Sequence, residues 1–214
     1  MKKMLLIVVA AQLCLSFFVH ADDEFSTDNF YAKVFGGVNF LQTNSDDGIK
    51  PNFDTGYIAS GALGYHWCNG LQLEAEYAFR RNSMSNIHYF GQDFNIPGHF
   101  QSSSYMGNLL WNIPLCWNLP LWNCLLSYTR PFLGGGIGYD VQQFHASDDG
   151  FRLNQDKKGF AWQLMAGFRY ALSSRSDITL EYKFHKGPLH NFFSHAIGIG
   201  LSYKFICGYS QENI

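Results

Sequence analysis

The sequence is poor in charged residues and in proline, and it has no excess of either charge sign. Only 15% of the 214 residues are charged, 6 are proline, and the formal net charge at pH 7 is −2. Proteins that bind nucleic acids neutralise phosphates with clusters of lysine and arginine, and such clusters are missing here. We therefore expect no nucleic acid among the partners of this protein.

Long apolar runs are also missing, except at the beginning of the chain. After residue 21 no stretch of about 18 apolar residues occurs, which excludes a transmembrane helix there. Residues 1–21 contain two lysines, an apolar run from Met4 to Val19, and Ala21 directly before the acidic Asp22. This pattern predicts a secretory signal peptide that is cleaved after Ala21, followed by a short periplasmic segment over residues 22–28. The chain is expected to be exported.

Aromatic residues and glycine, in contrast, are abundant. Aromatic residues make up 17% of the chain, and 21 residues are glycine. Such a chain has too few charges for a typical soluble domain and too little continuous hydrophobicity for a helical membrane protein. A membrane β-barrel, in which lipid-facing residues alternate with interior residues, reconciles the two observations. In residues 194–205, for example, one face runs from Ile197 to Phe205 in large apolar residues, and the other holds small residues and Lys204.

The same period of two residues recurs along the chain, which predicts one strand at each recurrence. The expected strands are residues 30–41, 57–66, 71–80, 103–112, 132–142, 160–170, 178–185 and 194–205. Their number is even, as in bacterial outer-membrane barrels. We therefore expect a monomeric, all-β protein with an eight-stranded antiparallel transmembrane β-barrel over residues 29–205 and a tail over residues 206–214.

The connections between the expected strands differ in length. Long polar connections at residues 43–54, 82–100 and 144–159 alternate with tight turns at residues 67–70 and 173–175. In outer-membrane barrels the long loops face the outside and the short turns face the periplasm. Two connections depart from this rule, the short outer loop over residues 186–193 and the long inner connection over residues 113–129. We expect the three long loops at the cell surface.

Charged residues also occupy the interior positions of the expected strands. The interior of an eight-stranded barrel is just wide enough for side chains, and lone buried charges are costly. Near-balanced charges there predict ion pairs that fill the lumen, although a catalytic or conducting cluster is the alternative. The expected lumen network consists of Lys33, Glu74, Glu76, Arg80, Asp140, Arg169, Glu181, Lys183 and Lys204.

No motif specifies a catalytic, cofactor or metal site. The histidines are scattered, and no His-x-x-x-His spacing occurs. Ser194 and His195 cannot form a dyad together, because adjacent residues of a strand point to opposite faces. Ser103 or Ser194 with His185 or His195 from a neighbouring strand stays open as a lipid-modifying pair. We expect no enzyme, no cofactor and no metal, with a narrow porin-like channel and a lipid-modifying enzyme as the rival functions.

Four cysteines follow the signal peptide, and the expected topology places all of them at the periplasmic rim. An even number in an oxidising compartment suggests disulfides. Cys116 and Cys124 bracket residues 117–123, and we expect them to pair with each other. Cys68 and Cys207 lie on strands that the first strand separates, so a bridge between them needs the tail to fold across. Free thiols, crosslinks to neighbouring envelope proteins, and reduced cysteines in apolar turns stay open.

Two segments and the terminal strand resemble a known family. Residues 106–111 (Met-Gly-Asn-Leu-Leu-Trp) and 130–139 (Arg-Pro-Phe-Leu-Gly-Gly-Gly-Ile-Gly-Tyr) resemble the fourth and fifth strands of the small outer-membrane β-barrels. This family includes opacity-type surface proteins and the membrane domain of outer membrane protein A. Residues 198–205 resemble its terminal strand, although this chain continues to Ile214.

The resemblance implies several properties of the protein. It implies a place in the outer membrane of a Gram-negative bacterium, in contact with outer-membrane lipid. The terminal aromatic residues, Tyr203 and Phe205, would be the signal that the barrel assembly machinery reads. The family also implies a surface protein that anchors to the envelope and contacts host surface molecules or other envelope proteins through its extracellular loops.

Overall fold

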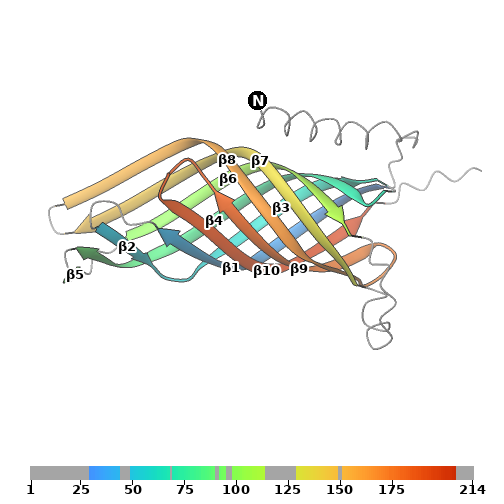
Figure 1. The fold of residues 1–214 in the computed structure, drawn as a ribbon, viewed down its shortest axis with the longest axis horizontal. Coiled ribbons are helices and arrows are strands. Elements are labelled where there is room, and N and C mark those ends of the chain that lie inside the picture. The colour runs from blue at the N-terminus through green and yellow to red at the C-terminus, as the bar shows by residue number, and fades with distance from the viewer. Residues whose placement is uncertain are drawn as a thin grey trace, which may run out of the picture.

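The computed structural model describes residues 29–43, 49–67, 69–89, 92–94, 98–113, 129–148 and 151–205. Within these ranges the regular structure is almost entirely strand (Figure 1). No helix of this described part has the length and apolar character needed to cross a membrane. The expected signal peptide, the segment over residues 22–28, the tail over residues 206–214 and all four mature cysteines lie outside the described residues.

Eight of the ten strands close into an antiparallel barrel. Each pairs with its neighbours in the wall, and the barrel closes where the first of them pairs with the last over residues Tyr31 to Thr43. The wall strands are β1 (Phe30–Thr43), β3 (Gly56–His66), β4 (Leu71–Tyr89), β6 (Gly98–Asn112), β7 (Thr129–Asp148), β8 (Phe151–Ala171), β9 (Ser176–Lys186) and β10 (Phe192–Lys204). The predicted eight-stranded barrel is confirmed.

Several wall strands are longer than a membrane requires. β4, β6, β7 and β8 contain 19, 15, 20 and 21 residues, whereas a tilted strand crosses a bilayer in about 9–11 residues. The register of β4 with β6 continues to the pair Met84 and Gly98, and that of β7 with β8 continues to Asp148 and Phe151. Two short strands, β2 (Ile49–Phe53) and β5 (Gln92–Phe94), pair with the end of β4.

These extensions form a paired sheet at one end of the barrel, which Figure 1 shows projecting beyond β9 and β10. We call it the outer sheet: β2, β5 and residues 81–89, 98–101, 143–148 and 151–158. The sequence had suggested long loops over residues 43–54, 82–100 and 144–159, and most of these residues instead lie in strands. Strand pairing satisfies the backbone N–H and C=O groups of these residues without a lipid-facing apolar side. The alternation that predicts the membrane strands therefore does not predict the extensions.

The side chains of the wall are apolar outside and polar inside, the reverse of a soluble protein. Outward residues such as Leu63 and Ile137 are 65% and 64% exposed, whereas inward residues such as Lys33 and Glu74 are buried. The outward side chains become polar between Phe79 and Arg81 on β4. This change marks the outer edge of an apolar band that fits the hydrocarbon region of a bilayer.

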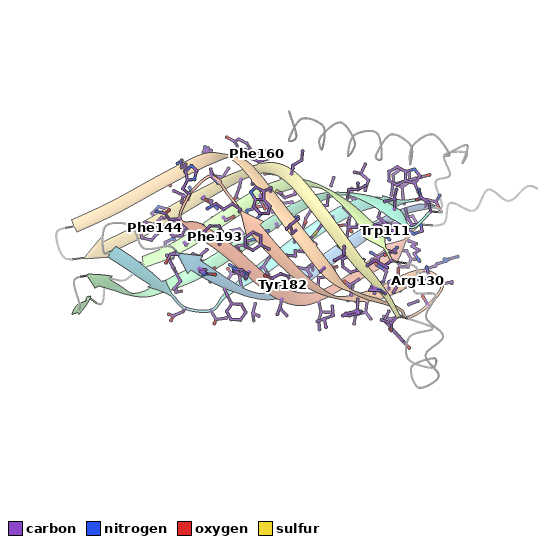
Figure 2. The ribbon with its side chains drawn as sticks, in the orientation of Figure 1. Trp111, Arg130, Phe144, Phe160, Tyr182 and Phe193 are labelled. Carbon is purple, nitrogen blue, oxygen red and sulfur yellow. The ribbon has the colours of Figure 1, made fainter. Side chains whose placement is uncertain are left out.

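Aromatic residues lie towards both edges of this band. Trp111 lies towards the end of the barrel where Arg130 is found, and Phe160 lies nearer the end with the projecting hairpins (Figure 2). Exposed rings on the outward face are typical of the girdles that outer-membrane barrels place at the two membrane surfaces. They include Tyr57, Trp111, Trp162, Tyr170, Tyr182, Tyr203 and Phe205.

The closing seam of the barrel contains a close approach of two inward glycines. Gly37 on β1 lies opposite Gly198 on β10. A Cβ atom added to Gly198 would lie 2.7 Å from the Cα atom of Gly37. At the outward neighbour Gly36, nothing lies within 4 Å of an added Cβ atom. The seam therefore needs glycine on its inner face and tolerates a side chain on its outer face.

Replacing Gly198 with valine is expected to lower the free energy of unfolding by about 1–3 kcal/mol, because overpacking pushes β1 and β10 apart. Gly36→Val is the matched control, and it is expected to change the free energy by less than about 0.5 kcal/mol. Urea unfolding of the refolded protein in detergent micelles measures both. Equal losses in the two variants would contradict the close approach.

Candidate functional site

A chain of buried ion pairs crosses the middle of the lumen. Lys33 Nζ lies 2.7 Å from Glu74 Oε1 and 3.4 Å from Glu181 Oε1. Lys183 forms an ion pair with Glu76, and its Nζ lies 3.8 Å from Glu181 Oε2. All five side chains are buried. They come from β1, β4 and β9, which are not neighbours in the wall, and the Lys183–Glu76 pair joins strands on opposite sides of the barrel.

Neutral side chains supply further hydrogen bonds to two of these carboxylates. Asn108 Nδ2 and Gln163 Nε2 donate to Glu76 Oε2 at 2.7 and 2.8 Å. The hydroxyl of Tyr31 donates to Glu74 Oε1 at 2.9 Å. A buried charge is tolerated when both an opposite charge and additional hydrogen bonds reach it. The ion pairs and these donors meet that condition together.

Two arginines of the expected network also lie in the lumen. Arg80 Nη1 donates to Ser104 Oγ at 2.7 Å, and Arg169 Nη2 donates to Gln72 Oε1 at 2.7 Å. Their hydrogen bonds to described residues go to neutral side chains, unlike those of the two lysines. The guanidinium of Arg169 also lies 5.7 Å from the ring centroid of Phe132.

Lys204 and Asp140 lie towards opposite ends of the lumen. Lys204 Nζ, at the end where Phe30 and Phe205 pair, lies 3.3 Å from Asp177 Oδ2, and the Lys204 side chain is partly exposed. Ser102 Oγ donates to Asp140 Oδ1 at 2.8 Å, and His185 Nε2 lies 2.9 Å from Asp140 Oδ2. Sequence reasoning missed Asp177 and His185 as network members. Their inward positions in the alternation with Glu181 and Lys183 could have indicated both.

The serine and histidine candidates for a lipid-modifying pair do not come together at the membrane face. Ser194 and His185 lie opposite each other on β10 and β9, but both are buried in the lumen. Ser194 Oγ donates to Asn39 Oδ1 at 2.5 Å. His195 points outward, with Nδ1 2.7 Å from the hydroxyl of Tyr182. Ser103 lies between the buried Ser102 and Ser104 and therefore points outward. The described hydrogen bonds join none of these serines to a histidine.

Four phenylalanines cover the outer mouth of the lumen, and we call them the aromatic cap. The rings of Phe100 and Phe192 stack with centroids 5.3 Å apart, and Phe53 packs edge-on against Phe100, Phe144 and Phe192. Phe53, Phe100 and Phe144 fall in the expected loops, so sequence reasoning did not find this cluster.

The connection between β9 and β10 folds over the same mouth. The backbone N–H of Leu189 donates to Gln142 Oε1 at 3.0 Å, and the Leu189 side chain is buried. A Cβ atom added to Gly187 would lie 2.5 Å from Asp140 Oδ2. The aromatic cap and this connection therefore lie directly above the Asp140 cluster and close the lumen from outside.

The comparisons with known proteins agree with this architecture. The family model of the outer membrane protein beta-barrel domain matches residues 7–205. An "Outer membrane protein" of Gluconacetobacter diazotrophicus is 28% identical over 199 residues, which cover 80% of this chain and 51% of that protein. The chain thus spans about half the length of this curated relative.

Two solved structures share the fold. Neisserial surface protein A is 14% identical with a TM-score of 0.56, and the match covers 83% of this chain and 97% of that one. OprG from Pseudomonas aeruginosa is 13% identical with a TM-score of 0.51, and the match covers 84% and 99%. The expected family and localisation are confirmed. The chain belongs to the outer membrane protein beta-barrel domain family and is a protein of the outer membrane.

Proposed function

We propose that the protein anchors a recognition surface to the bacterial envelope and contacts molecules outside the cell, without catalysis and without steady conduction. One observation carries the proposal: four wall strands continue past the apolar band as the outer sheet, while the lumen beneath it is filled. A protein that acts only within the membrane has no need of such extensions. A surface protein does, because they lift its contact residues away from the lipid.

The outer sheet has the chemistry of a contact surface. Its outward side chains on β4, β6 and β7 are polar, and they include Arg81, His99, Gln101 and Gln143. Exposed elements on a rigid scaffold commonly carry binding function. The partners of the proposed surface are host surface molecules or neighbouring envelope proteins.

Outer-membrane lipid surrounds the barrel, and the barrel assembly machinery would read Tyr203 and Phe205, whose rings are exposed at the end of the terminal strand.

The filled lumen argues against the rival function of a narrow channel. A solute entering from outside would have to displace the aromatic cap and then separate Lys33 and Lys183 from their carboxylates. Small barrels of this kind leave no aqueous path when side chains fill the interior. The polar lumen is therefore assigned to stability, and recognition to the outer sheet.

Trimming the outer sheet tests the proposal. A variant in which residues 144–155 are replaced by an Asn-Gly turn should keep its barrel, because residues 129–143 and 156–171 still pair across β7 and β8. Cells that display this variant should adhere to host-cell monolayers no better than cells without the protein. Heat-modifiable migration in gels checks that the barrel has folded. Full adhesion by a folded, trimmed variant would contradict the assignment of recognition to this hairpin.

Planar-bilayer recordings on the purified protein separate recognition from conduction. The unmodified protein should show no steady open-channel current, since its lumen is closed by side chains. A stable conductance would favour the channel and count against the proposal.

A further inference from the structure

Two histidines lie side by side on the outer sheet. His99 on β6 and His145 on β7 are direct cross-strand partners. Their ring centroids are 5.0 Å apart and the ring planes differ by 6°. Each is adjacent to an inward, buried phenylalanine, Phe100 or Phe144, so both histidines point outward. They lie beyond the apolar band, on the part of the wall that faces the medium.

One nitrogen of this pair has no hydrogen-bond partner in the described part of the chain. It is Nδ1 of His145, which is buried. A neutral imidazole nitrogen with a free lone pair is the most common metal ligand in proteins.

The cross-strand position also fits bidentate binding. Residues directly opposite in an antiparallel pair have Cβ atoms about 4.5–5.5 Å apart. Imidazole nitrogens bind zinc at about 2.0–2.1 Å, and copper and nickel are also suited to imidazole. Rotation of the stacked rings about their Cβ–Cγ bonds brings one nitrogen of each ring towards a shared ion.

We propose that His99 and His145 form a two-histidine site for a divalent late transition-metal ion, Cu²⁺ or Zn²⁺, on the outer sheet. The described residues contain no cluster of three or more potential metal ligands, so water completes the coordination. The bound ion ties β6 to β7 at the base of the β7–β8 extension. Affinity follows the usual order for such ligands, with Cu²⁺ above Zn²⁺.

The test is a titration of the full chain, without a polyhistidine tag, refolded in detergent at pH 7.5. Isothermal calorimetry with Cu²⁺ added as its glycine complex, which keeps the ion in solution, should show one site in the unmodified protein. His99→Phe and His145→Phe keep an aromatic ring in the stack but remove the ligand nitrogen. Each should weaken Cu²⁺ binding about 100-fold, because a chelate of two linked ligands becomes a single ligand. The double variant, which keeps neither ligand, should bind Cu²⁺ at least as weakly as either single variant.

His195→Phe is the matched control. His195 also points outward from a strand, but its ring is hydrogen-bonded to Tyr182. Its cross-strand partners are Phe40 and Phe184, and neither is a histidine. This variant should keep full Cu²⁺ affinity. The electron paramagnetic resonance spectrum of bound Cu²⁺ should show two equivalent nitrogen ligands in the unmodified protein and not in His99→Phe.

Several outcomes would overturn the site. Unchanged affinity in folded His99→Phe and His145→Phe would assign the pair to packing alone, and loss of binding in His195→Phe would move the site elsewhere. His99→Gln and His145→Gln replace the phenylalanine variants if those fail to fold.

Discussion

Replacing Glu76 with leucine is expected to lower the free energy of unfolding by about 3–5 kcal/mol, because it leaves an uncompensated buried lysine. Of the two carboxylates that it contacts, Lys183 would keep Glu181, whose Oε2 lies 3.8 Å from the Lys183 Nζ. Asn108 and Gln163 would also lose the carboxylate oxygen to which both donate. The loss therefore combines a stranded charge with the removal of two hydrogen bonds to the carboxylate.

Urea unfolding in detergent micelles, followed by tryptophan fluorescence, measures this loss. Removing both charges in Glu76→Leu with Lys183→Met should recover most of it, since no lone charge then remains in that pair. Lys158→Met, at an exposed position of β8, is the control and should change the free energy by less than about 0.5 kcal/mol. A double variant as unstable as the sum of its single variants would show that the ion pair is not the coupled unit described here.

The barrel could be predicted from the sequence because lipid and lumen impose opposite demands on alternate residues. In residues 71–80 this produces Leu71, Leu73 and Tyr77 on one face and Glu74 and Glu76 on the other, a pattern with period two. The outer sheet gave no such signal. Around Ser83 and Gln143 the outward side chains are polar while inward Met84 and Phe144 are buried, so the pattern of apolar outward residues ends while the backbone pairing continues.

The interior was predicted as a set of residues but not as a set of contacts. Alternation shows that Glu74 and Glu76 share one face, but it does not show that Lys33 meets the first and Lys183 the second. Those partners depend on strand tilt and stagger, which determine the depth that each residue reaches in the lumen. The stacking of His99 with His145 is equally a product of register, since the two residues lie on different strands and belong to no local motif.

Replacing Ile137 with arginine is expected to lower the free energy of unfolding in lipid vesicles by about 2–4 kcal/mol, the cost of a cation at the bilayer midplane. Ile137 lies on the outward face of β7, between Gly107 of β6 and Trp162 of β8. Its side chain is 64% exposed in the absence of lipid. It also lies near the middle of the apolar stretch that runs from Leu133 to Val141 on this strand.

Gln143 provides the control, because it lies on the same face of the same strand but within the outer sheet. Gln143→Arg should change the free energy by less than about 0.5 kcal/mol, since its side chain meets water and headgroups and no hydrocarbon. Denaturant unfolding of both variants in vesicles of equal thickness gives the comparison. A similar loss in the two variants would place the membrane boundary further along β7 and would draw residue 143, with the neighbouring His145, into the lipid. A difference of several kcal/mol would leave the outer sheet in the medium, where both recognition and metal binding require it to be.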